Sequence, residues 1–229
     1  MNVVVLLGAP GAGKGTQAPL LAARLGIPVV ATGDLFRAAV RDGTPLGLEA
    51  RRYMDAGQLV PDDITVRLLL ERLSRPDAAA GVILDGFPRT GVQAAALDRA
   101  LAEQAGRVRA AVLVDVAAEE LVRRLSGRWI CRAAGHHYHE VSSPPRVAGV
   151  CDLDGSELYQ RADDRPETIR NRMAQQLGSL AEVIDHYRAS GALRTVPGLL
   201  PIAEVAAGID AALAEAGVVA APGGAGAGA

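Results

Sequence analysis

The sequence GAPGAGKGT at residues 8–16 decides the fold of this chain. It follows a short, β-branched apolar run at residues 3–7. Residues 16–25 then show helical spacing, and Gly26 ends the pattern. A glycine-rich turn between a buried strand and a helix lets backbone N–H groups and the helix N-terminus surround a phosphate group. We therefore predict a phosphate-binding loop, in which the flexible ammonium group of Lys14 reaches the outer phosphates.

Two details of this loop set Lys14 and its neighbours apart. Lys14 is the one lysine among 24 basic residues, and arginine fills every other basic position. A bias of base composition toward arginine explains the other positions, but the lysine that persists in this loop indicates a site where arginine would not serve. Gly15 stands where the general pattern has serine or threonine, and the hydroxyl group arrives at Thr16.

Outward from the loop, short apolar runs alternate with helical segments. The runs at residues 29–31, 82–84, 110–116 and 193–196 predict further strands, and helices are predicted over residues 34–41, 45–56, 62–74, 93–104, 119–125, 167–190 and 202–216. This alternation predicts the α/β class, with a parallel sheet of the P-loop type and helices on both of its faces.

Two segments do not follow this rhythm. Residues 127–164 hold both cysteines, three of the four histidines and Pro144-Pro145, which indicates a small β-rich insertion. The tail at residues 221–229 consists of Ala, Gly and Pro alone and is expected to be disordered because it has no side chains to bury.

The composition excludes several classes of protein. Of the 229 residues, 49% are hydrophobic and 22% are charged, which excludes global disorder. The formal net charge of −2 and an aromatic content of 3% argue against a nucleic-acid or membrane-surface partner. Two cysteines are too few for a disulfide scaffold, and with neither a signal peptide nor a membrane span in the sequence we expect a cytoplasmic protein.

Carboxylates follow two of the predicted strands, as a Mg²⁺ site for phosphoryl transfer requires. Asp85 ends one strand and precedes Gly-Phe-Pro-Arg89, so a carboxylate and a guanidinium lie close together and indicate a shared phosphate–Mg²⁺ site. Asp115 ends the other strand, and because a helix begins just after it we interpret it as a turn or cap residue.

Several pieces of the sequence together resemble the adenylate kinases, in the bacterial form with a long lid. The phosphate loop ends in Lys-Gly-Thr16, Thr32-Gly-Asp34 with Arg37 is similar to the entrance of the AMP site, and Asp85-Gly-Phe-Pro-Arg89 with Gln93 is similar to the central signature. Gly127-Arg128 resembles the first hinge of the lid, and Arg161-Ala-Asp-Asp164 resembles the second. The match continues in order to about residue 215, and five such pieces in order are very specific.

The resemblance implies three parts and a reaction. Residues 1–30, 61–126 and 165–220 would form the core, residues 31–60 would bind AMP, and residues 127–164 would close over ATP as a lid. The chain would then act as a cytoplasmic monomer and convert ATP and AMP into two ADP with the help of Mg²⁺, anchored through water by Asp85.

The resemblance also assigns roles to individual residues. The loop residues Gly11, Ala12, Gly13, Lys14, Gly15 and Thr16 would hold the ATP phosphates, and His137, Tyr138 and the backbone of Leu200 would border the ATP adenine. Thr32 and Gln93 would read the adenine of AMP, in a pocket lined by Gln58, Leu59, Val60, Gly86, Phe87 and Pro88. The arginines separate into Arg37, Arg89 and Arg161 at the AMP phosphate and Arg124, Arg128 and Arg172 around the transferring group, with Arg172 in reach of AMP as well. Position alone would not distinguish these six arginines from the rest.

The lid departs from the zinc pattern that many relatives carry. That pattern has Cys-x₂-Cys followed by Cys-x₂-Cys or Cys-x₂-Asp, and here the four positions read Cys131, Ala134, Cys151 and Asp154. A structural zinc site requires four ligands, so with one missing we expect a lid without tightly bound zinc. A histidine at 136, 137 or 139 remains an alternative fourth ligand, and a Cys131–Cys151 disulfide is a further alternative that a reducing cytoplasm disfavours.

Three other functions compete with this interpretation. A kinase for UMP or CMP is the first, and Thr32 and Gln93 favour adenine over these bases. A nucleotide-dependent switch or ATPase without an acceptor is the second, although the set of arginines exceeds what hydrolysis requires. A zinc-ribbon binding module over residues 127–164 is the third, and the missing ligand argues against it.

Overall fold

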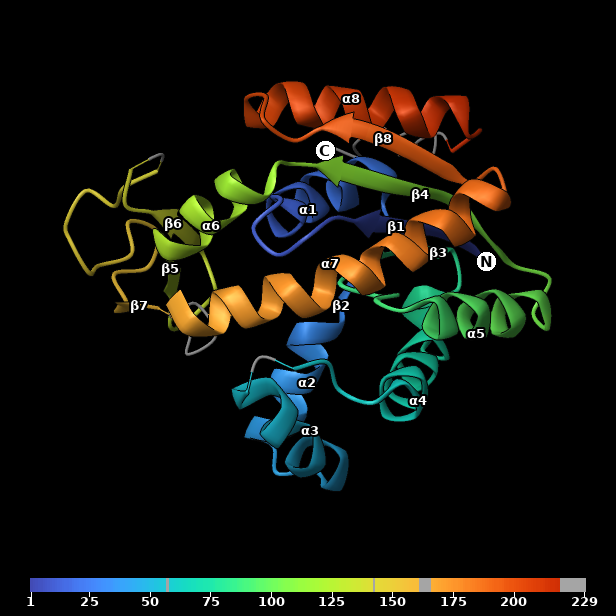
Figure 1. Cartoon of the computed structure of the whole chain (residues 1–229), viewed down its shortest axis with the longest axis horizontal. Helices are drawn as coiled ribbons and strands as arrows, with labels where there is room; N and C mark the ends of the chain where they lie inside the picture. Colours follow the sequence, from blue (N-terminus) through green and yellow to red (C-terminus); the bar gives the residue numbers. More distant parts are fainter. Residues whose placement is uncertain (57, 142, 161–165, 219–229) are drawn as a thin grey trace, which may run out of the picture.

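A computed structural model describes residues 1–56, 58–141, 143–160 and 166–218 of the chain, and within the last range it describes the backbone alone at positions 166, 167, 170–172, 174 and 175. The described residues form a five-stranded parallel sheet in the order β2-β3-β1-β4-β8 (Figure 1). Its strands are β1 (Asn2–Leu7), β2 (Val29–Ala31), β3 (Gly81–Asp85), β4 (Arg107–Asp115) and β8 (Leu193–Pro197). The predicted α/β class with a parallel sheet is therefore confirmed.

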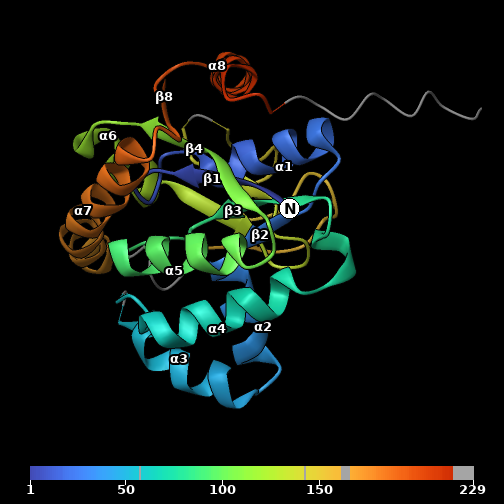
Figure 2. The ribbon, with the colours of Figure 1, turned by 90° about the vertical axis from the view of Figure 1, so that its right-hand side faces the viewer.

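Helices cover both faces of this sheet. The chain forms α1 (Lys14–Leu25), α2 (Thr32–Arg41), α3 (Pro45–Asp55), α4 (Asp62–Leu73), α5 (Gly91–Ala102), α6 (Ala118–Ser126), α7 (Pro166–Ala189) and α8 (Ile202–Glu215), with a 3₁₀ turn, η1, at Pro76–Ala78. Figure 2 shows α1 and α8 on one face of the sheet and α5 and α7 on the other. None of the helices within the described ranges combines the length and the apolar character needed to cross a bilayer.

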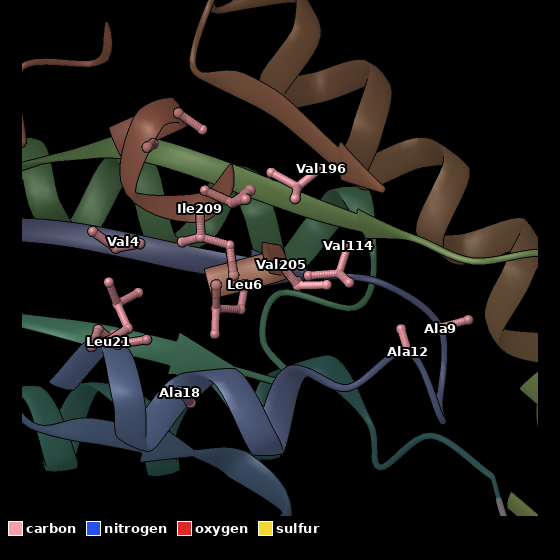
Figure 3. Close-up of a cluster of buried hydrophobic side chains, with 14 of the residues drawn as sticks. Val4, Leu6, Ala9, Ala12, Ala18, Leu21, Val114, Val196, Val205 and Ile209 are labelled. Carbon is pink, nitrogen blue, oxygen red and sulfur yellow. The ribbon is translucent and has the colours of Figure 1, made fainter. Parts of the chain in front are cut away.

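The central strand β1 divides its side chains between the two faces, because successive residues of a strand point in opposite directions. Val4 and Leu6 pack with Leu21 of α1 and Ile209 of α8 in one buried cluster, shown in Figure 3. Val3, Val5 and Leu7 pack in a second cluster, which includes residues of α4, α5 and α7. Five consecutive buried positions explain why this strand reads as an apolar run without alternation.

Strand register places the functional segments at one edge of the sheet. The pairs Val4–Ile83 and Val5–Ala111 are parallel, so the carboxyl ends of β1, β3 and β4 lie side by side. The phosphate loop follows β1, and Asp85 ends β3. Ligands of open parallel sheets bind beyond these carboxyl ends, so the register brings the predicted site together.

The predicted elements all form, with shifted ends that have local causes. Helix α1 begins at Lys14, two residues before the predicted start, because Gly13 takes a left-handed conformation directly before the helix. Helix α5 begins at Gly91 because the Thr90 hydroxyl accepts a hydrogen bond from the Gln93 N–H and caps the first turn. The turn η1 was not predicted, since three residues provide too short a pattern.

Helices α2 and α3 project from the sheet as a separate lobe, visible at the bottom of Figure 1. Phe36 of α2 and Ala50 of α3 form a buried cluster with Val60 and with Ile64 of α4. The two helices approach closely at Gly47, where an added Cβ would lie 2.1 Å from the Ala39 carbonyl oxygen. The glycine therefore allows the tight α2–α3 contact.

We expect Gly47→Ala to destabilise the protein by about 1–3 kcal/mol, because the new methyl group must push the two backbones apart. The matched control is Gly178→Ala in α7, where an added Cβ meets no atom within 4 Å and alanine favours the helix by roughly 0.5–1 kcal/mol. Denaturant unfolding of both variants measures the difference. Equal stability of the two variants would contradict the close contact.

Residues 128–159 contribute a second, antiparallel sheet, formed by β5 (Arg128–Cys131), β6 (His137–His139) and β7 (Leu158–Tyr159) in the order β6-β5-β7. Its small buried cluster contains Cys131, Tyr138, Cys151 and Leu158. The β-rich insertion predicted for this region is thus present in its described part. The predicted second hinge at 161–164 and the predicted disordered tail at 221–229 lie outside the described residues.

Candidate active site

A cleft with a volume of about 1390 Å³ opens at the carboxyl edge of the parallel sheet. The phosphate loop, α2 and the segment 134–139 of the small sheet all line it. Its size exceeds the range of roughly 300–1,000 Å³ that a single small-molecule site occupies. The cleft therefore has room for more than one nucleotide-sized ligand.

The phosphate loop turns sharply between β1 and α1. Gly8 has a φ of 144°, and a Cβ there would lie 2.9 Å from the Val114 carbonyl oxygen, so both conformation and space require glycine. The Lys14 ammonium donates hydrogen bonds to the carbonyls of Gly8 and Ala9, with N–O distances of 2.7 and 3.1 Å. Its side chain thus lies across the loop, at the mouth of the site where a phosphate would sit.

The cleft brings together most of the residues that the sequence predicts for the site. Its lining includes Gly11, Ala12, Gly13, Lys14, Gly15, Thr16, Thr32, Arg37, Gln58, Leu59, Val60, Asp85, Gly86, Pro88, Arg89, Gln93, Arg124, Arg128, His137, Tyr138 and Leu200. Phe87 differs, because its side chain is buried in the core cluster that contains Leu97 of α5. Arg161 and the side chain of Arg172 lie outside what the structure describes.

Asp85 lies beside the phosphate loop. A Cβ added to Gly15 would be 3.7 Å from the Asp85 carboxylate oxygen Oδ2, so the carboxylate faces the first turn of α1. A half-buried carboxylate next to a phosphate loop is the oxygen ligand that Mg²⁺ accepts, directly or through water. Asp115 is exposed at the end of β4, outside the cleft lining, and its carbonyl accepts a hydrogen bond from the Gly198 N–H.

The carbonyl oxygen of Gly86 accepts hydrogen bonds from two side chains that line the cleft. The Thr32 hydroxyl donates to it at 2.8 Å, and the Arg89 Nε donates to it at 2.7 Å. Gly86 has a φ of 75°, and a Cβ there would be 3.0 Å from the Arg89 guanidinium. Glycine therefore lets Arg89 fold back against the chain beside Thr32, and Arg37 pairs with Asp34 on the neighbouring helix α2.

Gln93 is 1% exposed, yet it reaches the cleft from the first turn of α5. Its Oε1 accepts a hydrogen bond from the Arg89 N–H at 2.8 Å, and its Nε2 donates to Asp62 Oδ1 at 2.7 Å. Asp62 begins α4 and is absent from the predicted site. The contact joins positions 31 residues apart, and an aspartate at a helix start is ordinarily interpreted as a cap.

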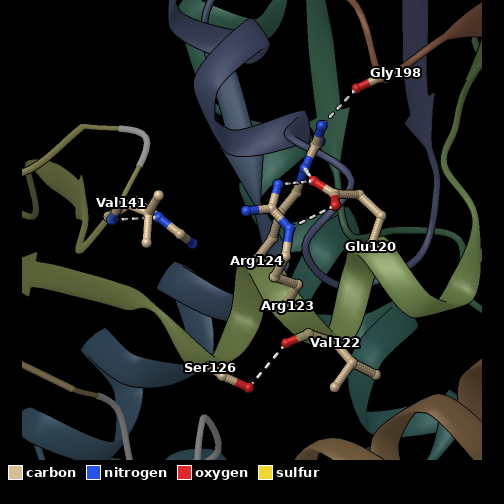
Figure 4. Close-up of polar contacts among 8 residues, drawn as sticks. Glu120, Val122, Arg123, Arg124, Ser126, Val141 and Gly198 are labelled. Carbon is tan, nitrogen blue, oxygen red and sulfur yellow. Dashed lines mark hydrogen bonds and ion pairs between the residues drawn. The ribbon is translucent and has the colours of Figure 1, made fainter.

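A carboxylate that the sequence reasoning missed, Glu120, positions two arginines that line the cleft. Glu120 accepts hydrogen bonds from Arg123 and Arg124, each at 2.8 Å, and Arg124 Nη2 also donates to the Gly198 carbonyl at 3.0 Å (Figure 4). The bonds from Arg123 and Arg124 lower the pKa of Glu120 to about 2. Glu120 is therefore ionised at neutral pH and holds the two guanidinium groups in place. The spacing of three and four residues on α6 is the signal that could have revealed it.

Four side chains in the small sheet lie in a compact cluster. The ligand atoms of Cys131, His136, Cys151 and Asp154 all lie within 4.8 Å of one another. His136 Nδ1 is 3.2 Å from the Cys151 sulfur and 3.3 Å from Asp154 Oδ2, and the Cys131 sulfur is 3.1 Å from the same oxygen. Two sulfurs, one imidazole and one carboxylate form a donor set that zinc accepts.

The expectation of a lid without tightly bound zinc assumed that the fourth ligand is missing, and this cluster supplies a fourth ligand. The sequence pattern leaves the fourth position to Ala134, and the structure places His136 there instead, from the turn that follows β5. His136 was one of three histidines that the sequence left as alternatives, and the sequence could not choose among them because the turn geometry decides which ring points inward. His137 is exposed, and His139 lies outside the cluster.

The surroundings of the cluster favour anionic ligands. Burial alone would raise the pKa of the Cys131 thiol, but hydrogen bonds from the Ser156 hydroxyl and the Ala134 N–H outweigh burial and lower the pKa to about 7. The Ser156 N–H donates to the Asp154 carboxylate and holds the pKa of Asp154 well below its usual range. The thiolate and carboxylate are the forms that bind a metal ion.

The fold and the cleft together define a class of protein. The first strand of a parallel sheet leads into a glycine-rich loop with a lysine, the adjacent strand ends in an aspartate, and several arginines line the cleft. These are the parts of a P-loop phosphotransferase.

Comparison with known proteins narrows this class. The family model described as adenylate kinase matches residues 6–192. An adenylate kinase of Lysinibacillus sphaericus is 47% identical over 213 residues, which cover 93% of this chain and 98% of the relative. Adenylate kinases of Carboxydothermus hydrogenoformans and Staphylococcus aureus are 48% and 46% identical, over 92% and 90% of this chain and 98% and 95% of their own lengths. The chain belongs to the adenylate kinase family, as the resemblance of its motifs predicted.

Proposed function

We propose that the two ends of the cleft bind ATP and AMP at the same time and bring the reacting phosphates together between Lys14 and Arg89. As a member of the adenylate kinase family, the chain transfers the γ-phosphoryl group of ATP reversibly to AMP and yields two ADP. One observation carries the proposed arrangement above the others: a single cleft joins the phosphate loop to the Thr32–Gln93 wall.

The proposed ATP half contains the loop at residues 11–16. Its backbone N–H groups and the N-terminus of α1 hold the phosphates, with Lys14 on the outer ones. Arg124 and Arg128, together with Arg172, surround the transferring group, and Glu120 keeps Arg124 aligned. His137, Tyr138 and the Leu200 backbone border the adenine. Tyr138 is 8% exposed as a residue and packs in the core of the small sheet.

The proposed AMP half lies against α2 and the start of α5. Thr32 and Gln93 read the adenine, and Arg37, Arg89 and Arg161 hold the phosphate. The segments at residues 31–60 and 127–164 act in this proposal as the AMP-binding part and the lid, with residues 1–30, 61–126 and 165–220 as the core. Guanidinium forks suit this task because each can bind two phosphate oxygens at once.

Little covalent chemistry is required of the protein in such a transfer, so catalysis rests on position and charge. The arginines and Lys14 offset the repulsion between two anionic substrates. A lid that closes only over both nucleotides excludes the water that would otherwise compete with AMP. Adenylate kinases are among the enzymes whose lids close over their substrates in this way.

Enzymes of this family use Mg²⁺ with ATP. We propose that Asp85 holds this ion through water, since its carboxylate faces Gly15 at the start of α1. The ion would supply charge neutralisation at the phosphate oxygens. The proposal extends to a monomer that acts in the cytoplasm, with ATP, AMP and ADP as its ligands and no nucleic-acid or membrane partner, in keeping with a net charge of −2.

Initial rates with a panel of acceptors test the proposed AMP half. With ATP as donor, we expect AMP to be phosphorylated far faster than UMP or CMP. A higher kcat/KM with UMP or CMP would contradict the placement of adenine against Thr32 and Gln93 and would favour the rival kinase.

The cluster Cys131–His136–Cys151–Asp154 supports a second proposal, that the lid holds one zinc ion with His136 as the fourth ligand. Ligand atoms around a tetrahedral zinc lie roughly 3.3–3.8 Å apart, which follows from bond lengths of about 2.0–2.3 Å. Three of the six separations among the four ligand atoms are 3.1–3.3 Å, and all six are within 4.8 Å, so the side chains lie near that arrangement. Zinc bound there would tie β5 to the 151–154 turn and stabilise a lid that has only a small apolar core.

We expect protein purified without added zinc to contain about one zinc per chain and His136→Ala to contain much less, because three ligands make a poor structural site. His137→Ala is the matched control for metal content, since the neighbouring ring lies outside the cluster. The double variant Ala134→Cys, His136→Ala should regain zinc, because it restores a thiolate in the Cys-x₂-Cys register. Metal analysis measures all four proteins, and a wild type without zinc, or a His136→Ala variant with a full complement, would contradict the proposal.

A further inference from the structure

A hydrogen-bond donor binds the oxygen end of the Gln93 side-chain amide, and an acceptor binds its nitrogen end. The Arg89 N–H donates to Oε1 at 2.8 Å, and Nε2 donates to Asp62 Oδ1 at 2.7 Å. The other carboxylate oxygen of Asp62 accepts a hydrogen bond from the Thr90 hydroxyl at 3.0 Å, and that hydroxyl accepts one from the Gln93 N–H at 3.1 Å. A closed ring of hydrogen bonds therefore links Asp62, Thr90 and Gln93.

This ring allows one orientation of the amide. The oxygen and nitrogen ends of an amide have nearly the same shape, so their partners alone decide which end lies where. A backbone N–H can only donate and an ionised carboxylate can only accept. The Arg89 N–H therefore requires the amide oxygen on its side, and Asp62 requires the amide nitrogen on the other. A reversed amide would lose both hydrogen bonds, and because Gln93 is 1% exposed, water could not replace them.

Each end of the amide retains capacity for one ligand. Nε2 has a second hydrogen and Oε1 a second lone pair, and Gln93 lines the cleft with Thr32. The edge of adenine presents an amino donor at position 6 and an acceptor at N1, whereas a 6-oxopurine presents an acceptor at position 6 and a donor at N1. Reversing the amide would thus exchange a match to adenine for a match to the 6-oxopurine.

We propose that Asp62 is a positioning residue that determines the choice of purine: it fixes the Gln93 amide in the orientation that pairs with a 6-aminopurine monophosphate and opposes a 6-oxopurine monophosphate. The inference rests on the proposed placement of the AMP adenine at Gln93. Asp62 is half-buried and outside the cleft lining, so it acts on the substrate through Gln93. Rejection by a fixed polar group is strong because the wrong base leaves buried groups unpaired.

The test compares Asp62→Asn with Asp63→Asn. The asparagine at 62 can offer an N–H₂ where the carboxylate offered an oxygen, so the Arg89 N–H alone then opposes the reversed amide. Asp63 is the matched control, since it lies next in the chain, is exposed and pairs only at 3.7 Å with Arg67 on the surface. The measurement is kcat/KM for AMP and for IMP with ATP as donor, together with the KM for ATP.

We expect Asp62→Asn to reduce the ratio of kcat/KM for AMP to kcat/KM for IMP by about 10-fold or more, mainly through a higher KM for AMP. The KM for ATP should be unchanged. Asp63→Asn should keep the wild-type ratio. A role confined to stability would lower kcat/KM for AMP and for IMP in the same proportion. An unchanged ratio of these two values in Asp62→Asn therefore overturns the inference. If Asp62→Asn does not fold, Thr90→Val decides, because it removes the bond to the second carboxylate oxygen and should shift the ratio in the same direction.

Gln93→Ala separates this inference from the proposal beneath it. If Gln93→Ala keeps the preference for AMP over IMP, the placement of adenine at Gln93 is wrong. If Gln93→Ala abolishes the preference and Asp62→Asn retains it, the placement stands and the role of Asp62 alone is refuted.

Discussion

Lys14→Met lowers the turnover of ADP formation by on the order of 10²-fold or more, because it removes a charge aimed at the site where negative charge develops during transfer. The ammonium group lies across the phosphate loop, 2.7 Å from the Gly8 carbonyl, at the edge of the cleft. Methionine keeps the apolar stem and the volume of the side chain, so the loop and α1 should remain folded.

Steady-state turnover and thermal unfolding of Lys14→Met separate the two effects. Lys14→Arg serves as a second variant that keeps the charge but replaces a compact ammonium with a longer planar fork. We expect it to lose activity as well, since the chain uses arginine at every other basic position and lysine here. Near-normal ADP formation by Lys14→Met, with the fold intact, would show that the phosphate loop has been assigned wrongly.

Arg89→Ala weakens the use of AMP far more than the use of ATP. The Arg89 Nε donates to the Gly86 carbonyl, which orients the guanidinium along the wall that also carries Thr32. Loss of a charge-assisted contact to the AMP phosphate should cost about 2–4 kcal/mol in kcat/KM for AMP.

The control is Arg99→Ala, an exposed arginine of α5 outside the cleft lining, which should leave both substrates unaffected. Varying one substrate at a time while the other saturates measures the two KM values. If Arg89→Ala changed only the KM for ATP, the assignment of this arginine to the AMP phosphate would be wrong.

Local features of the sequence predicted the fold well because its main elements have strong local signals. The run at residues 3–7 is buried on both faces, so it contains no polar residue that would obscure the strand. The loop at residues 8–16 combines a strand, glycines and a lysine within a short stretch, so its role could be predicted before any contact was known. The phosphate-loop and Asp85 predictions therefore needed no tertiary information.

The rest of the site depends on contacts between distant parts of the chain. Asp62 meets Gln93 across 31 positions, and the Arg124 guanidinium meets the Gly198 carbonyl across 74. Sequence patterns report neighbours within a strand or a helical turn, and such pairs lie far beyond that range. The sequence could not identify His136 as the fourth member of the cysteine cluster for a related reason. Three histidines lie within four positions, and the conformation of the turn determines which of them faces the cluster.

The most direct test of the account is the stoichiometry and acceptor dependence of ADP formation from ATP and AMP. With both nucleotides and Mg²⁺ present, the account predicts two ADP for each AMP consumed, with little loss of ATP when AMP is left out. ATP consumption at the same rate with and without AMP would contradict it, because the cleft would then serve hydrolysis and its second half would have no substrate.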